Sequence, residues 1–295
     1  MKVGVQLPEV EREVGWAEMK AIALTAEAGG LDSIWVGDHL LYRSRGRARG
    51  PWEAWSVLAG LAEATSRVEL GPLVAATGFH APAMLAKKAA TVDEISGGRL
   101  ILGLGAGSNE VDFEAFGFPL DRRVSRFEEA FGVIRLLLAG TVVDLDGEFY
   151  QLRGAELLPR PRPGIKLMIG SNGPRVLRIA APHVDMWNTW WAWFGNRAPG
   201  LAPLIESLAE ACRDVGRDPE DIEKTAAVYV QLTRGTGRDG GHDREEDNAI
   251  SGSHDEIASE LARFSEVGID HIQVVLDPID VAAVEELAEI VALLR

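Results

Sequence analysis

The stretch from residue 68 to residue 109 constrains the fold more than any other part of this sequence. Residues 68–74 are apolar and β-favouring around Gly71-Pro72, which predicts a strand interrupted by a bulge or bend. A helical pattern over residues 82–95 then stops at a Gly-Gly pair, and residues 100–104 form a second apolar run. A helix between two apolar strands is typical of a βαβ unit in a parallel sheet that is buried on both faces.

The same alternation of strands and helices continues along the whole chain. The strand-like runs are residues 3–7, 33–36, 68–74, 100–104, 166–169, 185–188, 226–232 and 272–276. The helical patterns are residues 16–28, 52–65, 82–95, 122–139, 175–181, 201–215, 253–267 and 281–294. Eight strands with alternating helices predict an α/β fold, a (β/α)8 TIM barrel that spans residues 1–295 as a single domain. A doubly wound sheet is the alternative, but nothing marks a domain boundary.

Two segments depart from this alternation. Residues 141–163 carry Asp146-Gly147 between β-like runs and three prolines, which predicts a hairpin as a small insertion after the fourth helix. Residues 233–248 are polar and glycine-rich, and we expect a flexible lid or a partly disordered loop there. A short sequence pattern also recurs at residues 27–34 and 266–272, where a glycine ends the helix and an aspartate precedes the next strand.

Composition and charge exclude several classes of function. The net charge of −15 argues against a general nucleic-acid binder or a membrane-surface protein. Cys212 is the single cysteine, which suits a reducing cytoplasm, and neither a signal-peptide run nor a stretch long enough to span a bilayer is seen. The histidines other than His39 show no metal-ligand spacing, and we expect no metal site; they are His80, His183, His242, His254 and His271.

In a barrel, the segments that follow the strands form the active site. They contain an Asp38-His39 pair, two glycine-rich loops and several tryptophans between residues 187 and 193. The segment after the second strand also carries four arginines, Arg43, Arg45, Arg47 and Arg49. This mixture suits a flat aromatic ligand that carries a phosphate better than it suits a metal.

An ordered set of motifs connects the chain to a known family. They are SIWVGDH at 33–39, KKAATVDEISGGRL at 87–100, LGAG at 104–107, EAFGFP at 114–119, Asp146-Gly147 and IGSNGPR at 169–175. With these motifs the chain resembles the bacterial luciferase-like oxidoreductase superfamily, and more closely its branch that uses the deazaflavin coenzyme F420. The match spreads over residues 3–190 and is weaker in the last third.

The resemblance implies a cofactor site made from several strand ends. It places a non-prolyl cis peptide at Leu73-Val74 behind the ring, and His39, the candidate catalytic residue, beside it; an ordinary bulge and a capping histidine are the alternatives. It assigns the phosphate to the loop before a helix, which could also be a plain helix start. The expected cofactor-binding residues are Asp38, His39, Leu73, Val74, Ala75, Ala106, Gly107, Ser108, Asn109, Gly170, Ser171, Asn172, Gly173 and Pro174.

Some positions depart from better-known relatives. The sugar-phosphate dehydrogenase of this branch has a tryptophan and a glutamate where this chain has about Arg43 and Ser108, so that specific activity is not expected. Asp112 stands where many relatives carry glutamate. The arginine loop could clamp the cofactor's phosphate and tail or be a solvated surface loop. The tryptophans could wall a substrate pocket or pack in the core.

The resemblance therefore implies hydride transfer between coenzyme F420 and a small organic substrate. The first alternative is a two-component monooxygenase of the same superfamily that uses FMN, and a non-catalytic cofactor-binding barrel is an alternative of another class. A metal-dependent hydrolase is a distant further possibility, because the first strand ends in Gln6-Leu7-Pro8 without paired histidines. Relatives also suggest a homodimer packed through helices near the second to fourth strands.

Overall fold

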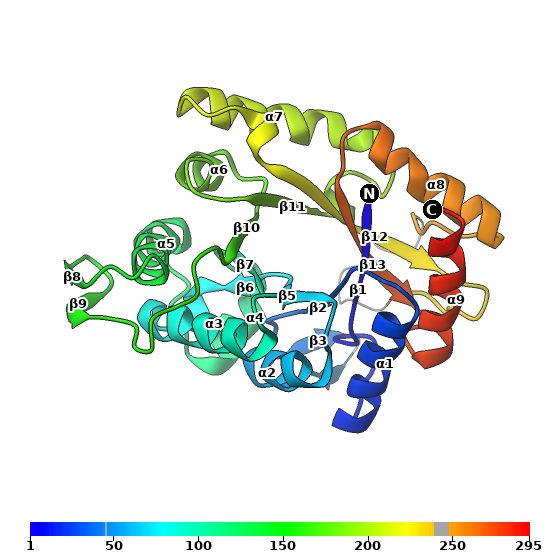
Figure 1. Ribbon diagram of the computed structural model, residues 1–295, viewed down its shortest axis with the longest axis horizontal. Coiled ribbons are helices and arrows are strands. Elements are labelled where there is room, and N and C mark those ends of the chain that lie inside the picture. The colour runs from blue at the N-terminus through cyan, green and yellow to red at the C-terminus, as the bar shows by residue number, and fades with distance from the viewer. Residues whose placement is uncertain (45, 239–247) are drawn as a thin grey trace.

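The computed structural model describes residues 1–44, 46–238 and 248–295 (Figure 1). Its main sheet is parallel and has the strand order β5-β2-β1-β13-β12-β11-β10-β7-β6. The strands are β1 (Lys2–Gln6), β2 (Ser33–Val36), β5 (Glu69–Pro72), β6 (Ala75–Ala76), β7 (Ile101–Gly105), β10 (Lys166–Gly170), β11 (Met186–Trp190), β12 (Glu223–Gln231) and β13 (His271–Asp277).

The sheet closes into the predicted barrel because β5 and β6 are two halves of one barrel strand. Pairing of Leu70 with Leu100 joins β5 to the start of β7, and Ala75 and Ala76 pair with the end of β7. The nine strands of the sheet therefore occupy eight positions around the barrel. The break between β5 and β6 falls where the sequence predicts a bulge or bend.

Helices surround the barrel, as Figure 1 shows. They are α1 (Trp16–Ala28), α2 (Ala54–Ala64), α3 (Pro82–Ser96), α4 (Glu110–Phe116), α5 (Arg123–Leu138), α6 (Pro174–Ala180), α7 (Ala202–Asp214), α8 (His254–Glu266) and α9 (Val281–Ala292). Local signals set their ends: Pro82 begins α3, Gly97 ends it with a φ of 72°, and Ser253 with Glu256 forms a capping box on α8. Sequence analysis missed α4.

Short elements lie outside the barrel. The predicted hairpin is present as β8 (Val143–Asp146) and β9 (Gln151–Ala155), at the left edge of Figure 1 beside α5. The segment expected to be an arginine-rich loop contains a second antiparallel hairpin, β3 (Tyr42–Ser44) and β4 (Arg47–Arg49). The single-turn 3-10 helices are η1 (Thr77–Phe79), η2 (Trp191–Trp193), η3 (Ala198–Leu201) and η4 (Pro219–Asp221).

The recurring aspartate before a strand has a structural cause. Asp32 accepts a hydrogen bond from the backbone N–H of Val3, and Asp270 accepts one from Lys224, at 2.8 and 2.9 Å. Asp185 binds the N–H of Leu167 in the same way at 2.8 Å. In each case the carboxylate lies before one strand and fixes the beginning of the neighbouring strand, which sets the register of the barrel.

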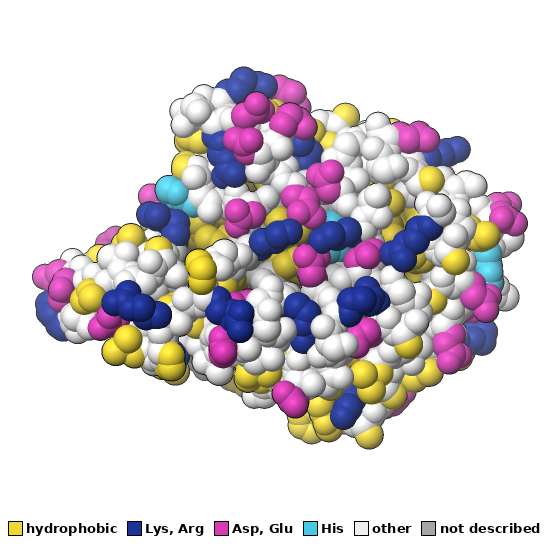
Figure 2. Space-filling model, viewed as in Figure 1, with side chains coloured by type: hydrophobic (Ala, Val, Ile, Leu, Met, Phe, Trp, Pro, Cys, Tyr) yellow, Lys and Arg dark blue, Asp and Glu magenta, His cyan; other side chains and the backbone are white. Residues whose placement is uncertain are grey.

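The interior of the barrel is filled at the N-terminal ends of its strands. Lys2 forms an ion pair with Glu69 at 2.7 Å, and Lys166 lies 3.5 Å from Glu223. Figure 2 shows basic and acidic side chains side by side across the middle of the molecule. Farther along the strands, a buried apolar layer contains Trp35, Ile101, Met168 and Met186. These charged groups and the apolar layer therefore occupy the N-terminal side of the barrel interior.

Candidate active site

The predicted site residues come together because parallel strands end on the same side of a sheet. His39 follows β2, Leu73 and Val74 lie between β5 and β6, Ser108 follows β7, and the loop 170–174 follows β10. The peptide bond between Leu73 and Val74 is cis, as the family resemblance implies. Leu73 and Val74 are only half-buried and pack on the apolar layer of the barrel interior. They form an apolar floor for the site.

Glycines make room for this floor. A Cβ atom added to Gly103, Gly105 or Gly170 would lie 2.8–2.9 Å from a γ-carbon of Val74. Such separations are shorter than van der Waals contact, so larger residues at these positions would collide with Val74. Gly103 and Gly105 of β7, together with Gly170 of β10, therefore accommodate Val74.

His39 is held in one orientation by a buried carboxylate. Its Nδ1 lies 2.7 Å from Oδ2 of Asp112, a residue with no exposed surface on α4. Asp112 also accepts hydrogen bonds from the backbone N–H groups of Leu40 and Leu41, at 3.1 and 2.8 Å, and from Nδ2 of Asn109 at 2.9 Å. Because Nδ1 is engaged, Nε2 is the nitrogen that His39 has available for a ligand.

The same carboxylate controls the charge of His39. Burial lowers the pKa of the imidazole, but the hydrogen bond to Asp112 and the negative charge of Glu9 outweigh burial, so the pKa of His39 lies above its usual value. The hydrogen bond from His39 and those from the backbone outweigh burial at Asp112, whose pKa is lowered. The contact between His39 and Asp112 therefore favours the charged form of each group.

Asp38 faces the barrel wall. Its Oδ2 accepts hydrogen bonds from the backbone N–H of Ala76 and from Nε2 of His80, both at 2.9 Å. Asp38 is 4% exposed, so these contacts account for its placement. Asp38 thereby fixes β6 next to the apolar floor, and its role in cofactor binding stays a prediction.

Sequence analysis missed a polar cluster that includes Tyr42, whose ring centroid lies 5.0 Å from that of His39. Glu9, which follows β1, accepts hydrogen bonds from Nε2 of Gln6 at 2.6 Å and from the hydroxyl of Tyr42 at 2.9 Å. Arg238 forms an ion pair with Glu11 at 2.7 Å and stacks on Trp190, 5.3 Å from the ring centroid. The sequence offered one signal for these residues, which is that they lie in segments that follow strands.

The structure places the arginines of residues 43–49 and the polar segment 233–248 partly otherwise than expected. Arg43 and Arg47 are exposed, Arg49 donates a hydrogen bond to the carbonyl of Glu11 at 3.1 Å, and Arg45 lies outside the described residues. The segment 233–248 was expected to be flexible, but Arg238 within it is 7% exposed and its neighbour Gly237 donates to Asp277 at 2.8 Å. Residues 239–247 lie outside the described part of the chain.

The loop from Gly170 to Pro174 precedes α6. Ser171 accepts a hydrogen bond from the indole of Trp187 at 2.9 Å, and Asn172 donates to Thr189 at 3.0 Å. The side-chain oxygen of Asn172 is buried and has no hydrogen-bond partner. Gly173 and Pro174 are exposed. The loop is thus anchored on one side and open on the other, and it offers one unsatisfied acceptor.

The tryptophans divide between the two interpretations. Trp187 and Trp191 are at most 1% exposed and belong to the core. Trp190 is half-buried beneath Arg238, and Trp193 is 69% exposed. Only Trp190 of this group therefore lies against the polar cluster of the site.

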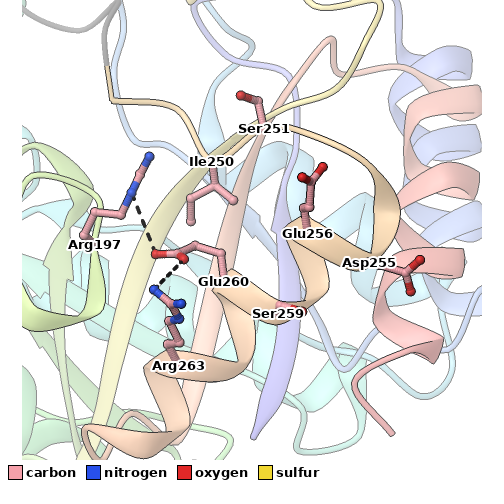
Figure 3. A pocket seen from close by; sticks show the side chains of 8 residues that line it. All are labelled: Arg197, Ile250, Ser251, Asp255, Glu256, Ser259, Glu260 and Arg263. Carbon is pink, nitrogen blue, oxygen red and sulfur yellow. Dashed lines mark ion pairs between the residues drawn. The ribbon is translucent and has the colours of Figure 1, made fainter.

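Another hollow in the described structure lies elsewhere. A pocket of about 420 Å³ beside α8 is lined by Arg197, Ile250, Ser251, Asp255, Glu256, Ser259, Glu260 and Arg263 (Figure 3). Its Glu260 lies between Arg197 and Arg263, at 3.7 and 3.1 Å, so these charges satisfy one another. None of the predicted site residues lines it.

The described part of the chain has neither a cluster of metal ligands nor a membrane-spanning helix. Within residues 1–44, 46–238 and 248–295, no three His, Cys, Asp or Glu side chains gather as a metal ion would require. In the same ranges, no helix has the length and apolar character needed to cross a bilayer.

The fold and the site define a (β/α)8 barrel with a fixed imidazole and an apolar floor at the C-terminal ends of its strands. The chain belongs to the luciferase-like monooxygenase family, whose model matches residues 1–236.

The chain is similar in sequence to several curated enzymes. The chain is 36% identical over 182 residues to 5,10-methylenetetrahydromethanopterin reductase of Archaeoglobus fulgidus, covering 61% of this chain and 50% of the relative. It is 33% identical over 241 residues to the phthiodiolone/phenolphthiodiolone dimycocerosates ketoreductase of a Mycobacterium species, with 75% and 62% covered. F420-dependent glucose-6-phosphate dehydrogenase of Amycolatopsis mediterranei is 30% identical over 240 residues, with 79% and 70% covered. The chain thus spans about half to 62% of the first two relatives.

Solved structures support the fold. An F420-dependent secondary alcohol dehydrogenase in complex with an F420–acetone adduct superposes with a TM-score of 0.84 at 22% identity, covering 100% of this chain and 99% of the other. Monooxygenase RslO1 from Streptomyces bottropensis superposes with a TM-score of 0.79 at 22% identity, covering 99% of each chain. At this level of identity the likeness shows the shared barrel.

Proposed function

We propose that this protein transfers a hydride between coenzyme F420 and a small organic substrate at the C-terminal mouth of the barrel. The observation that carries the proposal is His39, fixed by Asp112 at the end of β2, beside the half-buried floor of Leu73 and Val74. Curated relatives named as F420-dependent, at about 30% identity, support the choice of cofactor.

The residues present fit a flat ring that carries a phosphate chain. Leu73 and Val74 leave apolar surface open at the mouth, as a planar ring requires. Asn172 has a buried acceptor without a partner, which a hydroxyl of the cofactor's side chain would satisfy. A Cβ atom added to Gly173 would lie 3.6 Å from Ser171 Oγ, an ordinary van der Waals contact, so there is room for a ligand beside this residue.

Most of the predicted residues can be given a part on this basis. Leu73 and Val74 would support the ring, and Ala75, which is fully buried, would contribute only its backbone. The loop Gly170, Ser171, Asn172, Gly173 and Pro174 would hold the phosphate, and Ala106, Gly107 and Ser108 would line the path between them. Asn109 donates to Asp112 and to the carbonyl of Leu41, so it would brace His39.

The protein's own groups would orient the substrate and control protons. The bound deazaflavin supplies the carbon that gives or accepts the hydride. His39, positively charged through its contact with Asp112, would donate a hydrogen bond from Nε2 to the substrate oxygen and polarise a carbonyl group. The apolar floor would exclude water from the reacting carbon.

A binding titration tests the cofactor. We expect purified protein to bind F420 in preference to FMN, followed by fluorescence, and Gly173→Asp to weaken F420 binding at least 10-fold because a carboxylate would repel the phosphate. Gly173→Asn is the matched neutral control, which should bind within about 3-fold of the wild type. Equal effects of the two variants would show that the loop does not hold the phosphate.

The same titration decides between the remaining candidates. Preferential binding of FMN would favour a two-component monooxygenase, which the name of the matched family also allows. Binding of F420 without turnover of alcohols, ketones or conjugated carbonyl compounds would favour a non-catalytic barrel. Binding of neither cofactor would refute the proposed activity.

The oligomeric state and the compartment are further parts of the proposal. Large apolar side chains are exposed near the second to fourth strands, at Trp52 (60%), Met84 (55%) and Phe116 (51%), and they support a homodimer through this region. Sedimentation of the wild type and of Met84→Glu would test it. The single cysteine, Cys212, is buried and unbridged and supports a cytoplasmic location.

A further inference from the structure

Arg123, the first residue of α5, extends its side chain to the segment that follows β7. Its Nη1 donates a hydrogen bond to the carbonyl of Gly107 at 3.1 Å, and the residue is partly buried. A guanidinium carries five N–H donors, so this single bond leaves most of them available. Within the described residues, no carboxylate lies within ion-pair distance of Arg123. Its positive charge is therefore not balanced by a neighbouring side chain.

Three arginines near Arg123 differ from it because each has a carboxylate partner. The ion pairs are Arg122 with Glu148, Arg126 with Asp121 and Arg175 with Glu128. Of these four described arginines, Arg123 is the one whose charge is left for a group from outside the protein. Because a buried or half-buried cation is stabilised by an anionic partner, this position favours an anionic ligand.

Arg123 lies where the segment after β7 approaches the loop Gly170–Pro174. The strands β7 and β10 are neighbours, and a Cβ atom added to Gly105 would lie 3.4 Å from the carbonyl oxygen of the first residue of this loop. On the other side, Ser125 Oγ accepts a hydrogen bond at 3.1 Å from Arg175, the residue after the loop. The first turn of α5 thus contacts both segments along which the side chain of the cofactor is expected to run.

The loop itself supplies little positive charge for a phosphate. The helix that follows it, α6, has seven residues and begins with Pro174, which has no N–H group. The N–H of Gly173 already donates to Ser171 Oγ at 3.2 Å. A helix this short has a weak dipole, so a phosphate at this loop requires a cation from elsewhere in the chain.

We propose that Arg123 binds the phosphate of coenzyme F420 and holds it against the loop Gly170–Pro174. The inference rests on the proposed function and adds a residue of α5 to the cofactor site. A planar guanidinium can donate two parallel hydrogen bonds to a phosphate while a third N–H stays on Gly107, and this third bond fixes the direction of the side chain. The arginines of residues 43–49, considered for this role from the sequence, follow β2, and β5, β6 and β7 lie between β2 and β10.

Fluorescence titration with two deazaflavin ligands tests the contact. One ligand is F420, and the other keeps the ring and the ribityl chain but lacks the phosphate. Arg123→Gln should weaken F420 binding about 10- to 100-fold, as expected for loss of one hydrogen bond to a charged group. The same variant should bind the phosphate-free ligand within about 2-fold of the wild type, which also shows that its fold is intact. Arg123→Lys keeps the charge without the planar fork and should recover part of the F420 affinity.

Arg178→Gln is the matched control. Arg178 is exposed on α6 and donates a hydrogen bond to the carbonyl of Pro174 at 3.3 Å, so the variant removes the same charge near the same loop. We expect it to change F420 binding by less than about 3-fold, because water and salt screen an exposed charge. Equal effects of Arg123→Gln and Arg178→Gln would show that net charge alone matters, and would refute the proposal.

F420 without its glutamate residues distinguishes the phosphate from the tail. Arg123→Gln should weaken the binding of this shorter form as much as that of the full cofactor. A loss confined to the full cofactor would assign Arg123 to the carboxylates of the tail and would overturn its assignment to the phosphate.

A double-mutant cycle tests whether Arg123 and the loop hold the same group. If they share the phosphate, Gly173→Asp should weaken F420 binding by a factor about 3-fold smaller in the Arg123→Gln background than in the wild type. Additive effects of the two substitutions would place Arg123 and Gly173 at different groups of the cofactor and would contradict the proposal.

The outcomes separate this proposal from the proposed function. Wild-type affinity for F420 in Arg123→Gln would refute the role of Arg123 and leave the proposed hydride transfer intact. If the wild type bound FMN instead of F420, the proposed function would fail, and weaker binding of FMN but not of riboflavin by Arg123→Gln would still support a phosphate contact. Binding of neither cofactor by the wild type would overturn both proposals.

Discussion

Replacing Asp112 by asparagine removes a charge and keeps the shape of the side chain. Asp112 accepts four hydrogen bonds, two from the backbone N–H groups of Leu40 and Leu41 and two from His39 and Asn109. An amide has one oxygen, so it can keep only one of these pairs. The backbone donors cannot move, and we expect the oxygen to stay with them and the NH2 group to face the donors of His39 and Asn109.

The cost follows from the bonds that are lost. Each hydrogen bond to a charged group contributes about 1.5–3 kcal/mol to stability. In the variant, a neutral His39 can accept a hydrogen bond from the new NH2 group, which recovers about 1 kcal/mol. We therefore expect Asp112→Asn to lower the free energy of unfolding by about 2–5 kcal/mol at pH 6. The raised pKa of His39 stabilises the fold most below about pH 6.5, and this contribution is lost as the pH rises through the folded pKa. The deficit should thus be smaller at pH 9.

Urea denaturation at pH 6 and pH 9 measures this difference, and NMR titration of His39 reports its pKa. Glu114→Gln, at an exposed position of the same helix, is the matched control and should change the free energy of unfolding by less than about 0.5 kcal/mol. The reasoning would be wrong if Asp112→Asn were as stable as the control at pH 6, or if the pKa of His39 were unchanged by it.

Three further predictions concern packing, charge and pH. Gly170→Ala should lower the free energy of unfolding by about 1–3 kcal/mol, because its Cβ would lie 2.8 Å from both γ-carbons of Val74. Adding Val74→Ala should restore most of this stability in urea denaturation, and no recovery would contradict the contact. Arg238→Met should cost about 3 kcal/mol in the same assay because it leaves the largely buried Glu11 carboxylate without its partner, and a change below about 0.5 kcal/mol would refute this. Burial lowers the pKa of His271 to about 3, so the unfolded chain binds one more proton than the folded protein below about pH 6.5. Stability should accordingly fall by about 1.4 kcal/mol per pH unit from this group between pH 6 and pH 4, and His271→Gln should remove that slope; equal slopes would show that His271 is not buried as a neutral group.

The regular elements were predictable because their signals are local. The eight barrel strands are continuous apolar runs, and α3 is bounded by a proline and a left-handed glycine that act within one turn. The helix α4 was missed because its seven residues follow a glycine-rich segment and carry little periodicity. The hairpin β3–β4 was missed because arginines dominate it and no apolar alternation marks its strands.

The sequence by itself determined the barrel, the strand ends that meet at its mouth, and the family to which Asp38-His39 and the loop 170–174 belong. These follow from patterns between near neighbours and from motifs in a fixed order. Only the tertiary structure decided that Asp112 orients His39 across 73 positions of sequence, and that Arg238 neutralises Glu11 across 227. Such pairs form between loops that are far apart in the sequence and meet only in the folded barrel. Local sequence periodicity therefore does not predict them.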